Sequence, residues 1–190
     1  MRVMPLLPIL VLVTACSQKE EAPAEPTIHE IMKDRIDLHA DEVWELSNPA
    51  LDNDARIDAS RLTDARWDEI AMRATEVADA ANELAGLKTL VLVKPGVTIA
   101  DEDVEGGTSS EKVQALLDER PDDFRQFAGV LAAHMTDLAG AAKARDAARM
   151  TPLVDQLDGV CESCHLEFWY PDQRALVEAI RKASGDDPAN

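Results

Sequence analysis

Cys161-Glu162-Ser163-Cys164-His165 is the stretch that decides how this chain is interpreted. It has the form Cys-x-x-Cys-His, the attachment site of a c-type haem. In such a site the two thiols form thioethers with the porphyrin vinyl groups, and the histidine that follows ligates the iron. Residues three and four apart share one face of a helix. On a helix, both sulfurs and the imidazole therefore project to the same side, as attachment and ligation require.

A Cys-x-x-Cys pair can also form a disulfide, act as a redox dithiol or supply half of a zinc site. A structural zinc site needs four ligands. The only other cysteine is Cys16, and the remaining histidines are scattered along the chain: His29, His39 and His134. A thioredoxin-like motif lies near a βαβ pattern, and the sequence shows none. These observations favour one covalent haem c. A haem-free helical lipoprotein with a structural role is the alternative.

The N-terminal residues have the layout of an export signal. Arg2 precedes an apolar stretch over residues 3–13, and small residues precede the cysteine in Thr14-Ala15-Cys16. The apolar stretch is too short to span a membrane. The site resembles the bacterial lipobox, which predicts a lipoprotein signal peptide over residues 1–15 and lipidation of Cys16. A plain signal peptide with an unmodified cysteine is the alternative. Ser17 at the next position favours the outer membrane.

Export and haem attachment support each other, because covalent attachment in bacteria takes place outside the cytoplasm on reduced thiols. The prediction is therefore the periplasmic side of the bacterial envelope, with lipid as the only membrane anchor. Residues 16–26 are polar, acidic and proline-containing, which indicates a tether between the lipidated cysteine and the domain. If Cys16 carries lipid, Cys161 and Cys164 are the only cysteines left for other chemistry.

The chain is strongly acidic, with a formal net charge of -18 over 190 residues. This charge argues against nucleic acid or an anionic membrane face as a partner. It suits a redox partner protein with a basic docking face, and it suits equally a solvated acidic surface without a docking role. No phosphate loop, nucleophile–base pair or catalytic carboxylate cluster is evident. The sequence therefore does not predict an enzyme.

Apolar residues recur at spacings of three and four in four long segments, each bounded by helix start or stop signals. The predicted helices cover residues 27–46, 63–84, 121–144 and a last segment that begins at Asp146 or at Thr151-Pro152 and ends at Tyr170. The first helix starts with the capping box Thr27-x-x-Glu30. Its predicted apolar stripe comprises Ile28, Met32, Ile36, His39, Val43 and Leu46.

Shorter elements connect the long helices. Thr108-x-x-Glu111 predicts a minor helix that ends at Glu119. Residues 90–93 form an apolar run that is either a strand or, as we prefer, an extended cover over the helices. An amphipathic segment over residues 172–182 predicts a short C-terminal helix. Four long amphipathic helices with a cofactor motif in the inward stripe of the last one predict an all-α four-helix bundle over residues 27–170, followed by a helix and tail over 171–190.

This combination resembles the class II cytochromes c, the cytochrome c′ family with its low-spin relatives. Their four-helix bundles carry the haem motif near the C-terminus, as residues 27–170 do here. In low-spin members a methionine of the first helix, often followed by lysine, is the sixth iron ligand. Met32-Lys33 stands at the matching place. The resemblance therefore implies a periplasmic one-electron carrier with His165 and Met32 as axial ligands, and it also implies a possible homodimer.

Other ligand sets stay open from the sequence. Met32 could be ordinary core filling, and His39 on the same stripe would give a bis-histidine haem. The resemblance does not favour ligands from the later helices, where Met72, His134 and Met135 lie. Five-coordinate gas-binding members of the family are the alternative function. They usually carry a basic residue four places after the ligand histidine, whereas this chain has Trp169 there. Phe168, Trp169 and Trp44 are expected to pack on the porphyrin edge or to seal the bundle.

Overall fold

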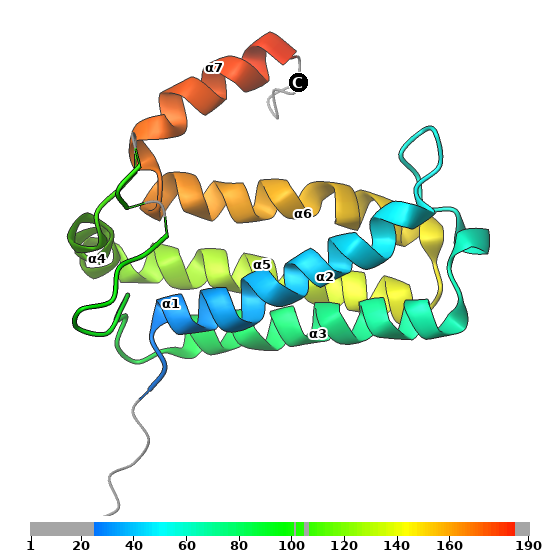
Figure 1. The fold of residues 1–190 in the computed structure, drawn as a ribbon, viewed down its shortest axis with the longest axis horizontal. Helices are drawn as coiled ribbons and strands as arrows, with labels where there is room; N and C mark the ends of the chain where they lie inside the picture. The colour runs from blue at the N-terminus through cyan, green and yellow to red at the C-terminus, as the bar shows by residue number, and fades with distance from the viewer. Residues whose placement is uncertain (1–24, 101, 105–106, 185–190) are drawn as a thin grey trace, which may run out of the picture.

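The computed structural model describes residues 25–100, 102–104 and 107–184, and in them the chain forms a bundle of helices (Figure 1). The N-terminal rod (Ile28–Ser47) lies along α3 (Asp64–Gly86), α3 packs on α5 (Pro121–Lys143), and α5 packs on α6 (Ala147–Phe168). The only β pairing in these ranges is an isolated bridge between Leu51 and Ile57. The predicted all-α four-helix bundle is confirmed. The helices of four or more residues are α1 (Ile28–Ile31), η1 (Met32–Asp37), α2 (Leu38–Ser47), α3 (Asp64–Gly86), α4 (Ser110–Glu119), α5 (Pro121–Lys143), α6 (Ala147–Phe168) and α7 (Arg174–Ser184).

The N-terminal rod runs through α1, η1 and α2, and its winding changes in the middle. The predicted capping box is confirmed, because Thr27 Oγ1 accepts from Glu30 N at 3.3 Å and Glu30 Oε2 accepts from Thr27 N at 2.9 Å. The middle segment η1 is a π-helix. A π-helix inserts an extra residue into the turn, so the buried positions step by five from Ile31 to Ile36.

Because η1 is a π-helix, the predicted apolar stripe of the first helix is only partly right. Only half of its six members are buried, namely Ile28, Ile36 and Val43. The other three are half-buried, namely Met32, His39 and Leu46. Because the period of the helix shifts at η1, residues that look equivalent in the sequence pattern point to different sides of the rod.

Alanines dominate the contact between α3 and α5, which is the most extensive helix–helix contact in the bundle. Small side chains let two helix backbones approach closely. The buried alanines on the two helices are Ala71, Ala74, Ala78, Ala80 and Ala81, and Ala128, Ala132, Ala139, Ala141 and Ala142. This pair forms the rigid centre on which the N-terminal rod and α6 are mounted.

We expect Ala81→Leu to lower the free energy of unfolding by about 1–3 kcal/mol, because extra carbon atoms in a filled core force neighbours out of their rotamers. Ala81 has no exposed surface. The measurement is guanidinium unfolding, with Ala65→Leu on the exposed side of α3 as the matched control. Equal unfolding free energies for both variants would show that the α3–α5 contact has unfilled space.

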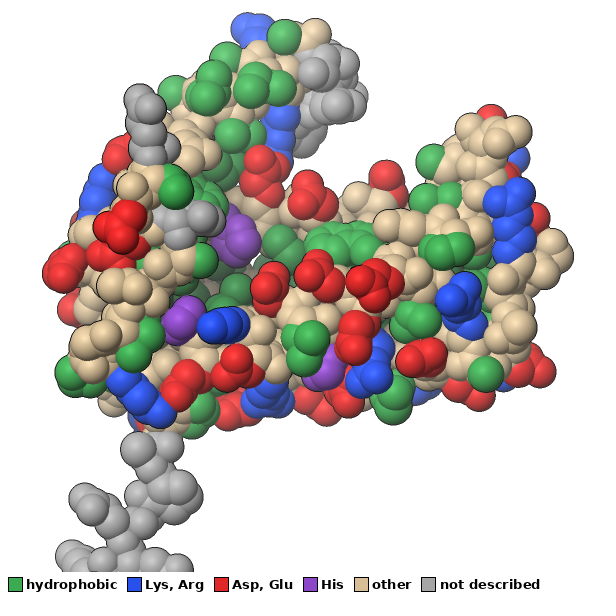
Figure 2. Space-filling model, viewed as in Figure 1, with side chains coloured by type: hydrophobic (Ala, Val, Ile, Leu, Met, Phe, Trp, Pro, Cys, Tyr) green, Lys and Arg blue, Asp and Glu red, His purple; other side chains and the backbone are tan. Residues whose placement is uncertain are grey.

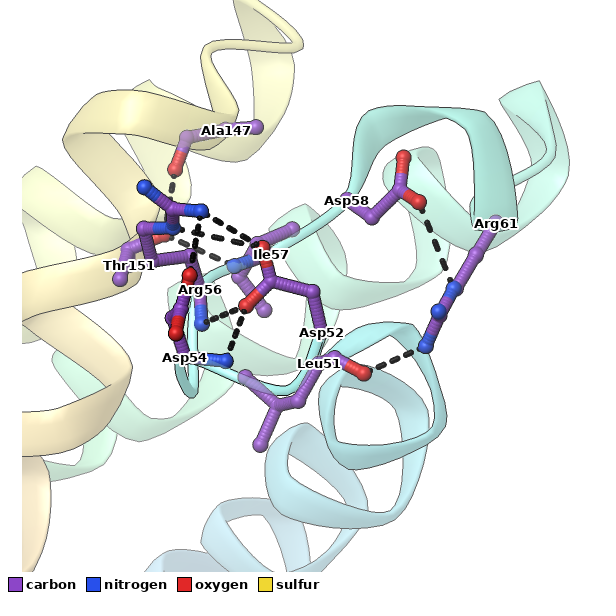
Figure 3. A network of polar contacts seen from close by, with 9 residues as sticks. All are labelled: Leu51, Asp52, Asp54, Arg56, Ile57, Asp58, Arg61, Ala147 and Thr151. Carbon is purple, nitrogen blue, oxygen red and sulfur yellow. Dashed lines mark hydrogen bonds and ion pairs between the residues drawn. The ribbon is translucent and has the colours of Figure 1, made fainter.

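The loop between α2 and α3 is ordered by its own charges and is fastened to α6 (Figure 3). Asp52 Oδ1 accepts from the backbone nitrogens of Asp54 and Arg56, both at 2.9 Å. Arg56 also pairs with the carboxylates of Asp52 and Asp54. Ile57 N donates to Thr151 Oγ1 at 3.0 Å. This hydrogen bond therefore ties the first turns of α6 to the loop between α2 and α3.

Two predicted helix starts can now be decided. Asp146 caps α6, since its Oδ1 accepts from Arg149 N at 3.0 Å, so the earlier of the two predicted starts is confirmed and Pro152 lies inside the helix. The predicted cap of α4 at Thr108 is wrong. Ser109 is the cap, because its Oγ accepts from Lys112 N at 3.3 Å. Thr108 is buried one residue earlier.

The segment over residues 90–93 is extended, as preferred from the sequence, and it crosses the start of the N-terminal rod. Ile28 N and His29 N donate to the carbonyls of Val91 and Leu92, both at 2.9 Å. Gln114 of α4 clamps the same segment, accepting from Leu92 N and donating to the Leu90 carbonyl, both at 2.8 Å. The segment thus fixes the position of α1. Among the described residues, every helix is too short or too polar to cross a lipid bilayer.

Candidate haem site

The haem-attachment motif lies in the last two turns of α6. Cys161, Cys164 and His165 are each half-buried, and both cysteines are free thiols. The spacing of three and four residues along a continuous helix places the three side chains on one face. The structure therefore brings together the thiols and the imidazole that the sequence predicted to act together.

The electrostatics of the pair are unlike those of a redox dithiol. Burial raises the pKa of Cys161 to about 11, and the carboxylates of Asp158 and Asp37 add to the effect. Burial, together with Cys161 and Glu167, raises the pKa of Cys164 to about 12. Reactive Cys-x-x-Cys pairs have lowered thiol pKa values. Both thiols here stay protonated at neutral pH, which disfavours dithiol or thiolate chemistry.

His165 is set up as a neutral imidazole. Burial lowers the pKa of His165, while the carboxylates of Asp37, Asp158 and Glu162 oppose the shift. The net direction is downward, so the ring is neutral at pH 7. Neutral imidazole is the form that ligates a metal. The charge state of His165 thus suits an axial iron ligand.

A hollow lies beside the motif, between α6 and the N-terminal rod. α6 packs on α5 and the rod packs on α3, but the described residues of α6 and of the rod share no extensive contact. Figure 2 shows this face hollowed, with hydrophobic side chains on its floor and acidic side chains along both rims. Asp37 of the rod and Asp158 of α6 both act on Cys161 and His165. The two elements therefore face each other across the hollow.

Met32 lies at the start of η1, in the part of the rod that also contains Asp37. Met32 is half-buried and packs against the core. It begins the π-helix η1 and Asp37 ends it. Hydrogen bonds in a π-helix join residues five apart, so Asp37 lies one turn above Met32. Asp37 also raises the pKa of Cys161, so this part of the rod lies within electrostatic range of the haem motif.

The rival ligands lie elsewhere. His39 Nδ1 is 2.8 Å from Glu42 Oε2 and 3.5 Å from Glu76 Oε2 of α3, so His39 lies on the side of the rod that faces α3. His134 Nε2 is 2.8 Å from the Leu153 carbonyl and joins α5 to α6. Met72 is 46% exposed, Met135 is fully buried and His29 is half-buried at the start of the rod. The contacts of His39 and His134 are therefore with residues outside the motif.

The end of α6 is held by a contact that the sequence analysis missed. Arg120 donates from Nη1 to Glu167 Oε2 at 2.7 Å and from Nη2 to the Glu167 carbonyl at 2.8 Å. Its guanidinium also lies 4.9 Å from the ring centre of Phe168. Phe168 is buried edge-on against Phe124 and Phe127, at 5.7 and 6.2 Å between ring centres. Phe168 therefore seals the end of the bundle, one of its two expected roles.

The aromatic residues after the motif surround the imidazole. The ring centres of Trp169 and Tyr170 lie 6.4 and 6.3 Å from that of His165. Both backbone nitrogens donate to the His165 carbonyl at 2.7 Å. Trp44 is half-buried and packs on the core. Trp169 and Tyr170 are thus both aromatic neighbours of His165, and no local sequence signal distinguished Trp169 from Phe168.

An all-α bundle with Cys-x-x-Cys-His on its last long helix defines a c-type cytochrome of the four-helix-bundle class. The family model for Cytochrome C′ matches residues 53–169, more than half of the chain, and the chain therefore belongs to the cytochrome c′ family. It is accordingly a haem protein with one covalent haem c and not an enzyme. No curated protein and no solved structure matches the chain.

The residues present fit a covalent haem. Two free, protonated thiols, a neutral histidine and an adjoining hydrophobic hollow are the groups that thioether formation and iron ligation need. The matched range contains α3 to α6 and leaves out both the N-terminal rod and α7. The roles of Met32 and of α7 therefore depend on the structure of this chain rather than on the family match.

Proposed function

We propose that the protein is a one-electron carrier, with haem c attached through Cys161 and Cys164 and its iron ligated by His165 and Met32. The bound haem supplies an iron that changes reversibly between the ferric and ferrous states. The observation that supports the proposal is that Met32, half-buried in η1, shares this π-helix with Asp37, whose carboxylate acts on Cys161 and His165. Support also comes from His39, whose ring is engaged with Glu42 and Glu76 on the α3 side.

The chain contributes ligands on rigid supports. His165 lies in α6, whose first turns are tied to the α2–α3 loop by Thr151 and whose end is held by Arg120. Met32 lies in a rod whose start is fixed by the extended segment over residues 90–93. Ligands that keep their positions in both oxidation states keep the reorganisation small. A thioether ligand favours the ferrous state and raises the reduction potential.

Absorption spectra of both oxidation states, with and without carbon monoxide, test this function. We expect a low-spin spectrum in each state and no ready binding of carbon monoxide, because both axial positions are filled by side chains. Ready binding of carbon monoxide by the unmodified protein would instead support a five-coordinate gas-binding haem protein. A colourless protein after correct maturation would instead support the alternative of a haem-free helical lipoprotein.

We further propose that the protein acts at the periplasmic side of the envelope, held by lipid on Cys16. Residues 1–15 serve as the signal peptide and 16–26 as the tether; Cys16 lies outside the described residues. The bundle over 27–170 then meets a redox partner, for which a basic docking face suits the net charge of -18. Nucleic acid is not expected as a partner, and a homodimer is a further proposal.

Replacing Cys16 by serine will remove the anchor. We expect Cys16→Ser protein to appear in the soluble periplasmic fraction and to lack the mass of the lipid, because a hydroxyl cannot replace the thiol that takes the lipid. Membrane fractionation and intact-mass measurement give the result. Ser17→Ala is the matched control and should stay with the membrane. A Cys16→Ser protein that remains membrane-bound would contradict the lipoprotein reading.

A further inference from the structure

α7 is an amphipathic helix whose apolar side is uncovered. Leu176 and Ile180 are 62% and 56% exposed, and Val177 between them is half-buried. Their spacing of three and four places them on one face, here called the α7 stripe. An isolated helix of 11 residues is marginal in water. An apolar group that covered the α7 stripe would therefore stabilise this helix.

Two arginines fasten α7 across the haem motif. Arg174 donates to Glu167 Oε1 at 2.7 Å, and Arg181 pairs with Glu162, which lies inside the motif. The first arginine thus meets α6 after His165 and the second meets it before His165. α7 therefore runs antiparallel to α6 over the motif, as Figure 1 also shows. The arginines lie seven residues apart on one side of α7, next to the α7 stripe.

α7 lies beside the same stretch of α6 that carries the haem motif. Figure 2 shows an open notch between α7 and the body of the bundle, with hydrophobic side chains on α7. A porphyrin attached through thioethers to Cys161 and Cys164 would lie against this part of α6, and covering its apolar surface would stabilise the contact.

We propose that the α7 stripe covers the outer edge of the haem, with Arg174 and Arg181 as the fastenings that position it. The inference rests on haem attachment at Cys161 and Cys164, but not on ligation by Met32. It assigns a role to a helix beyond the part of the chain that the family model matches. The cover keeps water from the haem edge, and the haem in turn stabilises the helix.

A lipid surface is the rival occupant. α7 carries three basic residues and one acidic residue in a chain of net charge -18. Basic amphipathic helices bind anionic membranes. The haem is favoured because Arg174 and Arg181 are already paired with carboxylates of α6. Their charge is therefore used within the molecule and is not free to attract an anionic membrane.

Hydrogen–deuterium exchange of residues 174–184 in the full-length holoprotein tests the cover. The variant is Leu176→Gln with Ile180→Gln, and Ala175→Gln on the opposite, exposed side of α7 is the matched control. We expect exchange in α7 to be about tenfold faster in the double variant than in the other two proteins, since its packing on the haem is lost. We also expect a lower reduction potential, because water at the haem edge stabilises the ferric charge.

Equal exchange in the three proteins with equal potentials would overturn the cover. Vesicles of phosphatidylcholine with phosphatidylglycerol form the second arm. α7 could be protected from exchange only when vesicles are present, with this protection lost in the double variant. That result would assign the α7 stripe to a membrane and would also overturn the proposal. The absorption spectrum of the same samples distinguishes failure of the cover from failure of the proposed iron ligation. A high-spin ferric spectrum would contradict ligation by Met32, independently of the exchange measured in α7.

Discussion

Replacing Met32 by alanine will convert the ferric protein from low-spin to high-spin and open the ferrous protein to carbon monoxide. The thioether is the sixth ligand in the proposed function, and alanine offers no donor atom. We also expect the reduction potential to fall by on the order of a tenth of a volt or more, within the range of about 0.8 V over which axial ligands act. Absorption spectra, carbon monoxide titration and potentiometry give the three results.

Two control variants separate ligation from general disturbance. Met72→Ala removes an exposed methionine of α3 and should leave the spectra unchanged. His39→Gln tests the bis-histidine alternative and should also leave them unchanged, because the His39 ring is engaged by Glu42 and Glu76. If Met32→Ala kept a low-spin ferric spectrum and lost it only when His39 was also replaced, His39 would be the sixth iron ligand.

Replacing Cys161 and Cys164 together by alanine will abolish covalent haem attachment. Without either thiol no thioether can form, so the protein expressed with a haem-attachment system should show the mass of the polypeptide alone. We also expect a lower thermal stability than in the holoprotein, because a bound group that favours the native state stabilises it by mass action. Intact-mass measurement and thermal unfolding followed by circular dichroism give the results.

Ser163→Ala is the matched control for the cysteine variant. Ser163 lies between the two cysteines and donates to the Val160 carbonyl at 2.7 Å. The control should therefore keep the full haem mass. A double cysteine variant that still gained the mass of one haem after denaturation would place the attachment elsewhere and would contradict the assignment of the motif.

The long helices could be predicted from the sequence because their signals are local. Apolar spacing, the Thr27 capping box and the prolines gave the extent of each helix to within a few residues. The haem motif was equally local, since its three functional residues lie on one turn of α6. Contacts that join distant residues left no such pattern. Arg120 with Glu167 and Arg181 with Glu162 link separate elements, and no spacing rule indicates them.

The π-helix escaped prediction for a different reason. Met32 is apolar and lies four residues before Ile36, so the sequence pattern continues without a visible break. The structure instead buries Ile31 and then Ile36, and leaves Met32 half-buried at the side. Thr108 was wrongly chosen as a cap because Ser109, its neighbour, is an equally good capping residue and takes the position.

The π-helix also sets an angular offset between the two halves of the N-terminal rod. One residue advances an α-helix by about 100°. Deleting one residue from Met32–Asp37 while keeping α2 on the core would therefore swing everything before the deletion about a quarter turn around the rod axis. The start of the rod is clamped by the carbonyls of Val91 and Leu92 and resists that swing. The two ends of the rod are fixed independently of each other. The extra residue of η1 thus lets both ends keep their positions while Met32 lies at the side of the rod.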